Sequence, residues 1–69
     1  MTGKEFIRRV RRLARKRGLI VRLLEDRGKG DHIRLYLDSR WTTLPGSGEL
    51  GKGILHAMCK QLGIRAGDL

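Results

Sequence analysis

Residues 32–37 read HIRLYL, a run in which polar and apolar side chains alternate at every step. Successive side chains of a β-strand point to opposite faces, so this run predicts a strand with one apolar and one polar face. The apolar face consists of Ile33, Leu35 and Leu37. The polar face consists of His32, Arg34 and Tyr36. Such a strand packs one face against a core and leaves the other to solvent, so His32 is expected on an open face at the start of the strand.

Two further strands are expected around this one. The β-prone run LIVRLL at residues 19–24 precedes it, and the glycine-containing segment EDRGKGD at 25–31 reads as a hairpin loop between the two. After a tight connection at 38–40, residues 41–44 form a third strand. Pro45 ends the pairing of that strand because proline has no N–H group to donate to a neighbour.

A helix is expected on each side of these strands. The first covers residues 3–17, with Thr2 as N-cap, Glu5 completing a capping box and Gly18 as C-cap. Its apolar residues recur every three or four positions and form one stripe, made of Phe6, Ile7, Val10, Leu13 and Ala14. The second helix covers residues 53–62, and its stripe is made of Ile54, Leu55, Met58 and Leu62. The residues from 64 onward are expected to be irregular.

This order of elements predicts an α+β fold in two layers. Neither helix can bury its stripe alone, so both are expected on the apolar face of a three-stranded antiparallel sheet, as an α-β-β-β-α sandwich with two helices on one face. A length of 69 residues predicts a single domain over residues 1–69. So short a chain has little room for a deep pocket. A function carried by its surface is therefore expected, with no cofactor.

Charge points to a polyanionic partner. Lys and Arg total 16 and Asp and Glu total 7, which gives a formal net charge of +9. The polar face of the first helix is almost wholly basic, with Arg8, Arg9, Arg11, Arg12, Arg15 and Lys16 against the single acidic Glu5. Arg8, Arg12 and Arg15 are predicted to contact phosphates. The apolar stripe of this helix is needed for the core, which argues against a membrane. Charge alone does not separate DNA, RNA and an acidic protein.

Several classes of site are excluded by the residues present. The single Cys59 cannot form an internal disulfide, and one cysteine with two histidines at unrelated spacings makes no zinc cluster. No segment has the apolar core of a signal peptide or approaches the roughly 20 apolar residues of a membrane span. The expected location is therefore the cytoplasm. His56 falls between the stripe residues of the second helix and is expected to face outward.

His32 is the residue best suited to chemistry on RNA. Strand cleavage needs a proton taken from a 2′-hydroxyl and another given to the leaving 5′-oxygen, and histidine can serve in either role near neutral pH. Lys29 and Arg34 flank it and are predicted to bind the phosphate. A second proton carrier is not indicated, although Tyr36 and Lys29 are candidates. From the residues alone, an exposed strand histidine is more often an ordinary surface residue.

The glycine-rich segment GSGELGKG at 46–53 resembles a phosphate-binding loop only superficially. The spacing from Gly46 to Lys52 is met, but Gly53 stands where Ser or Thr would bind a metal ion. A nucleotide site is therefore not expected. The start of the second helix, with Lys52, is still predicted to bind a backbone phosphate.

Three segments in order resemble the HicA family of bacterial toxins. They are the basic first helix, the loop and strand GKGDHIRLYL, and the stretch TTLPGSGELGKGILHAMCKQLGI, and together they span residues 2–64. The resemblance implies a fold like the double-stranded RNA-binding domain. It also implies an endoribonuclease that cleaves mRNA without a metal ion and a HicB-like antitoxin that neutralises it.

The catalytic histidine of this family follows a glycine and a small polar residue at the start of the second strand. Gly30, Asp31 and His32 match that position, although family members often have Ser where this chain has Asp31. Many members also have a His where this chain has Gly46. The leading hypothesis is thus a ribonuclease toxin with His32 as general acid or base. The alternatives are a non-catalytic RNA-binding module of the same fold and a small interaction protein that docks an acidic partner.

Overall fold

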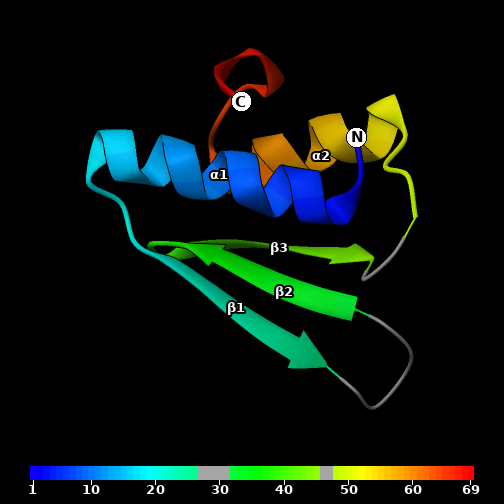
Figure 1. Ribbon diagram of the computed structural model, residues 1–69, viewed down its shortest axis with the longest axis horizontal. Coiled ribbons are helices and arrows are strands. Elements are labelled where there is room, and N and C mark those ends of the chain that lie inside the picture. Colours follow the sequence, from blue (N-terminus) through cyan, green and yellow to red (C-terminus); the bar gives the residue numbers. More distant parts are fainter. Residues whose placement is uncertain (27–31, 46–47) are drawn as a thin grey trace.

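The computed structural model describes residues 1–26, 32–45 and 48–69 and confirms the predicted α+β fold. Figure 1 shows both long helices on one face of a three-stranded sheet, with the other face uncovered. The elements in chain order are α1 (Gly3–Arg17), β1 (Val21–Asp26), β2 (His32–Leu37), β3 (Arg40–Pro45), α2 (Lys52–Leu62) and a short 3-10 helix, η1 (Ala66–Asp68).

The sheet is an antiparallel meander in the order β1-β2-β3. β2 is hydrogen-bonded on both edges, and its central residue Leu35 pairs with Leu23 on one side and Thr42 on the other. Asp38 turns the chain between β2 and β3 with a positive φ of 54°, which aspartate tolerates better than most residues. Its Oδ1 also accepts the backbone N–H of Ile20 at 2.7 Å. The β2–β3 turn therefore holds the beginning of β1 in place.

Both predicted caps of α1 are present. The Thr2 hydroxyl accepts the backbone N–H of Glu5 at 3.2 Å, and Gly18 ends the helix in the left-handed conformation. The predicted capping box is only half formed, because the Glu5 carboxylate accepts hydrogen bonds from Arg8 and Arg9 on the following turn and not from the Thr2 backbone N–H.

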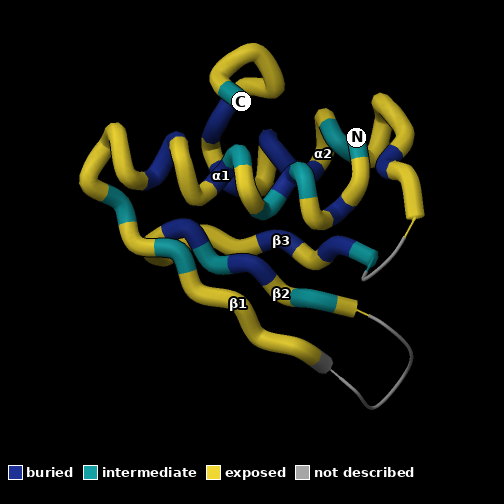
Figure 2. The backbone as a smooth tube through the Cα atoms, viewed as in Figure 1, coloured by how far each residue is buried: buried dark blue, intermediate teal, exposed yellow. Residues whose placement is uncertain are grey.

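The core lies between the helices and the covered face of the sheet. Figure 2 shows buried residues along β2, β3 and both helices, whereas most of β1 is exposed. The buried apolar residues are Phe6, Val10, Leu13, Ala14, Leu35, Leu37, Leu44, Leu50, Met58, Cys59, Leu62 and Ile64. Thr42 is the buried polar residue among them, and its hydroxyl donates to Gln61 on α2. This bond satisfies a hydroxyl that would otherwise be costly to bury.

Several predicted boundaries were wrong, and each has a local cause. β1 begins at Val21, because Leu19 donates to the last turn of α1 and Ile20 is bound to Asp38. It extends to Asp26, into the segment predicted as a loop. β3 runs from Arg40 to Pro45, one residue longer at each end than predicted, and α2 begins at Lys52. The tail contains η1 where no regular structure was expected.

The apolar stripe of α2 also differs from the prediction. Ile54 is 53% exposed, whereas Cys59 is fully buried in the core with Met58. The helix is rotated so that Leu55, Met58, Cys59 and Leu62 face the core. Within the described residues, no helix has the length and apolar character needed to cross a membrane.

The exposure difference between Met58 and Ile54 predicts very different costs for two substitutions on one helix. Met58→Ala should lower the free energy of unfolding by about 2–5 kcal/mol, because it leaves a cavity in the core. Ile54→Ala should change it by no more than about 0.5 kcal/mol, because the side chain is largely in water. Chemical denaturation of the two variants and the wild type measures both values. Equal losses would contradict this rotation of α2.

Candidate functional site

The predicted site residues of strand β2 lie on the uncovered face of the sheet. Leu35 and Leu37 are buried beneath the helices, and Ile33 packs against the same core. The alternate residues therefore lie on the opposite face. There His32 and Arg34 are exposed, as the sequence predicts, while Tyr36 is half-buried.

His32 is the first residue of β2 and lies at one end of the sheet. Its backbone pairs with Asp26 of β1 and with Pro45 of β3. Asp26 was expected in the hairpin loop, so its pairing with His32 was not foreseen. The second predicted neighbour of His32, Lys29, lies outside the described residues together with Gly30, Asp31 and Gly46.

Arg34 shares the open face with His32, but its guanidinium is directed elsewhere. Its Cζ lies 4.4 Å from the centre of the Trp41 ring, and its Nη1 is 3.4 Å from the Tyr36 hydroxyl. The first contact is a cation–π interaction, and the second is long for a hydrogen bond. Trp41 pairs with Tyr36 in the register, and Tyr36 lies two residues further along β2 from His32 than Arg34 does. The guanidinium of Arg34 is thus directed along β2, away from His32.

A second arginine lies on an aromatic ring of the open face. The Cζ of Arg22 on β1 is 5.0 Å from the centre of the Tyr36 ring. Arg22, Tyr36 and Trp41 are direct register partners across the three strands. We call Arg22, Arg34, Tyr36 and Trp41 the open-face cluster.

Trp41 and Arg22 were missed as site residues from the sequence. Their signal was present in the alternation of β3 and β1. Thr42 and Leu44 are buried, so Trp41 must lie on the open face. Only the pairing across the two-residue turn at 38–39, however, places Trp41 opposite Tyr36.

Tyr36 is poorly placed to be a second proton carrier beside His32. Their Cα atoms are four residue steps apart along the strand, a distance of about 13 Å. The attacking and leaving oxygens of one phosphodiester are bonded to the same phosphorus atom, so two groups acting on them must lie much closer together. Tyr36 is therefore part of a neighbouring surface.

The basic residues of α1 form a separate surface in the helical layer. Lys4, Arg8, Arg11, Arg12 and Arg15 lie on one side of the helix, and with Ile7 they line a shallow hollow of about 450 Å³. This basic stripe faces away from the core. Because α1 covers the other side of the sheet (Figure 1), the structure does not bring Arg8, Arg12 and Arg15 to His32.

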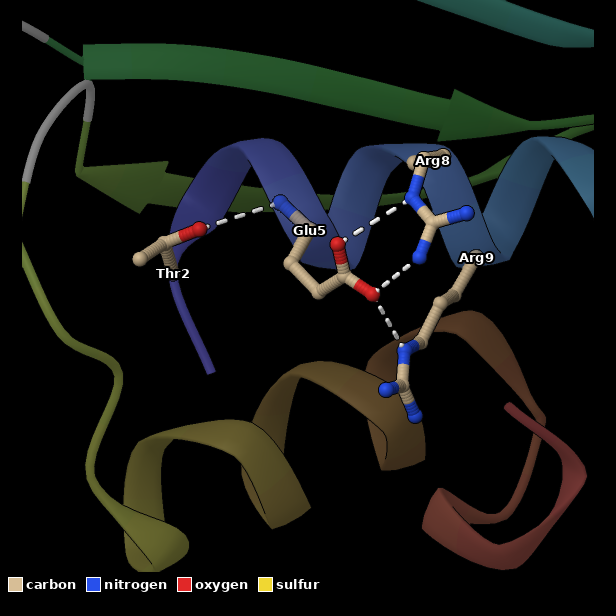
Figure 3. Close-up of polar contacts among 4 residues, drawn as sticks. All are labelled: Thr2, Glu5, Arg8 and Arg9. Atoms are coloured by element: carbon tan, nitrogen blue, oxygen red, sulfur yellow. Dashed lines mark hydrogen bonds and ion pairs between the residues drawn. The ribbon is translucent and has the colours of Figure 1, made fainter.

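Glu5 neutralises part of that stripe. Its carboxylate pairs with Arg8 through two contacts and accepts from Nε of Arg9 at 2.9 Å, as Figure 3 shows. The hydrogen bonds from Arg8 and then Arg9 lower the pKa of Glu5 to about 2, so the carboxylate stays charged at any physiological pH. In the described residues no carboxylate pairs with Arg12 or Arg15. Arg12 and Arg15 are therefore better placed than Arg8 and Arg9 to bind an external anion.

Lys52 and His56 lie on α2, in the helical layer. Lys52 is exposed at the first position of the helix, which begins at the same end of the molecule as β2 (Figure 1). His56 is exposed, as predicted. Burial raises the pKa of the Cys59 thiol, which disfavours the thiolate, the form that acts as a nucleophile.

Comparison with known proteins identifies a family. The model of the family described as "HicA toxin of bacterial toxin-antitoxin" matches residues 4–64. No curated protein and no solved structure matches the chain.

Arg12 and Arg15, which pair with no carboxylate in the described residues, allow a test with salt. If Arg12 and Arg15 contact phosphates, Arg12→Gln with Arg15→Gln should flatten the plot of log affinity for single-stranded RNA against log salt. Each lost contact should reduce its slope by about 0.7. Fluorescence anisotropy over a range of salt concentrations measures this slope.

A matched double variant controls for net charge. Lys60→Gln with Arg65→Gln removes the same two charges from exposed positions outside the stripe. It should leave the slope nearly unchanged. An equal effect of the two double variants would show that only the total charge matters and that the stripe is not a specific contact surface.

Proposed function

Because the chain belongs to the HicA toxin family, we propose that it is an endoribonuclease toxin in which His32 carries the cleavage of mRNA. The family supports a toxin role and implies a cognate antitoxin. His32 is the observation on which the enzymatic part depends. It is exposed at the start of β2, on the uncovered face, where the family resemblance puts a catalytic histidine.

The proposed reaction uses the RNA's own 2′-hydroxyl as nucleophile. His32 in its neutral form accepts the proton as the 2′-oxygen bonds to phosphorus, or in its protonated form donates one to the 5′-oxygen as the P–O5′ bond breaks. The products are a 2′,3′-cyclic phosphate on one fragment and a 5′-hydroxyl on the other. The proton balance closes with one further carrier, which can be water, and no metal ion is required.

Cations near His32 would stabilise the charge that develops on the phosphate. Lys29 precedes His32 by three residues, and Arg34 follows it by two on the same face. For Arg34 to reach a phosphate at His32, its guanidinium would have to leave Trp41 and turn back along the strand. In the observed conformation it is better placed to hold the next part of the RNA chain.

The basic stripe and Lys52 would have a more distant role. They lie in the helical layer, so they can attract a polyanion or hold a flanking segment of RNA without touching the scissile phosphate. A HicB-like antitoxin with an acidic surface could dock on the same residues. The cluster of Arg22 and Arg34 with aromatic rings favours RNA as one ligand of the open face.

A non-catalytic RNA-binding module remains the alternative, since the open-face cluster would suit it equally well. The two functions differ only in what His32 does. His56 offers a matched control because it is the other histidine of the chain, exposed, and on the helical layer.

His32→Ala should abolish toxicity and RNA decay on induction in a bacterial host without antitoxin. Wild type and His56→Ala should both arrest growth, because each retains the proposed general acid or base. Growth curves, with total RNA examined by northern blot, measure the outcome. Thermal unfolding of the purified variants checks that each is folded.

Two results would count against the catalytic role. If folded His32→Ala is as toxic as the wild type, His32 is not needed. If the wild type itself neither arrests growth nor degrades RNA while binding it, the chain is an RNA-binding module.

A further inference from the structure

We propose that the open-face cluster is a base-stacking subsite for unpaired nucleotides of RNA, next to the position of His32. The proposal rests on the function proposed above, since it names how the same surface would hold its substrate. It concerns a surface that neither the basic stripe nor His32 accounts for.

The aromatic residues of the chain are distributed unevenly. The chain has one Phe, one Tyr and one Trp. Phe6 is fully buried in the core, whereas Tyr36 and Trp41 face each other across β2 and β3 on the uncovered side of the sheet. Trp41 is 47% exposed. A large apolar ring left in water on an open sheet face is a typical feature of a contact surface.

The two arginines make this aromatic pair a better fit for nucleic acid than for an apolar ligand. The guanidinium of Arg34 lies on Trp41 and that of Arg22 lies on Tyr36, at 4.4 Å and 5.0 Å from the ring centres. A planar guanidinium can stack on a base while its N–H groups reach phosphate oxygens. The cluster therefore presents both stacking planes and positive charge at one place.

The sheet also provides apolar surface beside the cluster. Leu24 is 56% exposed on the open face and pairs with Arg34 in the register. A hollow of about 270 Å³ lies against Arg22, Leu23, Leu24 and Tyr36. A base stacked on the cluster would lie partly over this surface, whereas the paired bases of a duplex present only their edges and could not enter it.

The place of the cluster relative to His32 suits a single RNA strand. The cluster begins two residues along β2 from His32 and extends to Tyr36, about 13 Å away by the rise of a strand. A short run of unpaired nucleotides can span this distance with one phosphate at His32 and a base at Trp41. The cluster would then hold and orient the strand, as a positioning surface and not as a catalytic group.

Trp41 is the only tryptophan, so its fluorescence reports directly on the cluster. The probe is a single-stranded RNA of about ten nucleotides, within the range that such surfaces cover. It is added to the full chain carrying His32→Ala, which removes the proposed cleavage. Two matched probes are an abasic strand of equal length and a blunt RNA duplex. The proposal predicts strong quenching by the single strand and little by the other two.

Affinity provides a second readout. Trp41→Ala should weaken binding of the single strand about 5- to 150-fold, the range expected for losing one stacked base. Trp41→Phe should restore most of it, and binding of the abasic strand should hardly change. Ile54→Ala removes a similarly exposed apolar side chain from the helical layer and should have no effect.

Several results would overturn the proposal. Absent quenching, or equal quenching by the abasic strand, would mean that no base stacks on Trp41. Loss of antitoxin binding by Trp41→Ala with unchanged RNA affinity would make the cluster a protein-docking surface.

Failure of the wild type to cleave RNA, with base-dependent quenching intact, would reject the ribonuclease proposal and leave the stacking subsite standing.

Discussion

The central strand β2 is hydrogen-bonded on both edges, and this pairing divides the molecule into a covered side and an open side. Leu35 and Leu37 anchor the core under the helices, so a slip of one residue would turn these leucines to solvent and bury His32 and Arg34 instead. The cost of such a slip fixes the register firmly. The chemistry of the open face therefore depends on the same apolar contacts that stabilise the fold.

The division separates two basic surfaces that were both predicted to contact phosphates. The basic stripe of α1 lies on the helical side, while His32, Arg34 and Arg22 lie on the sheet side. One RNA strand could reach both only by passing around the edge of the sheet. The stripe is therefore suited to long-range attraction or to an acidic partner. Under the proposed function, the open face would have to hold the strand near His32 by itself.

Sequence patterns predicted the elements that depend on local spacing. The bounds of α1 and β2 are correct because caps and strict alternation specify them. The errors arise from contacts between distant residues. Ile20 is bound by Asp38, which delays β1. The packing of α2 against β3 turns Cys59 into the core and leaves Ile54 exposed. Trp41 was missed because only the pairing of β3 with β2 sets it beside Arg34 and Tyr36.

The chemical ends of RNA fragments test the central claim that His32 on the open face cleaves RNA through its 2′-hydroxyl. The purified protein would be incubated with RNA in the presence of a metal chelator, and the fragments analysed by mass spectrometry. The predicted fragments carry a 2′,3′-cyclic phosphate, or the phosphate formed from it, and a 5′-hydroxyl. A 2′-O-methylated copy of the same RNA should stay intact. Fragments with 5′-phosphate ends, or cleavage of the methylated copy, would contradict the claim.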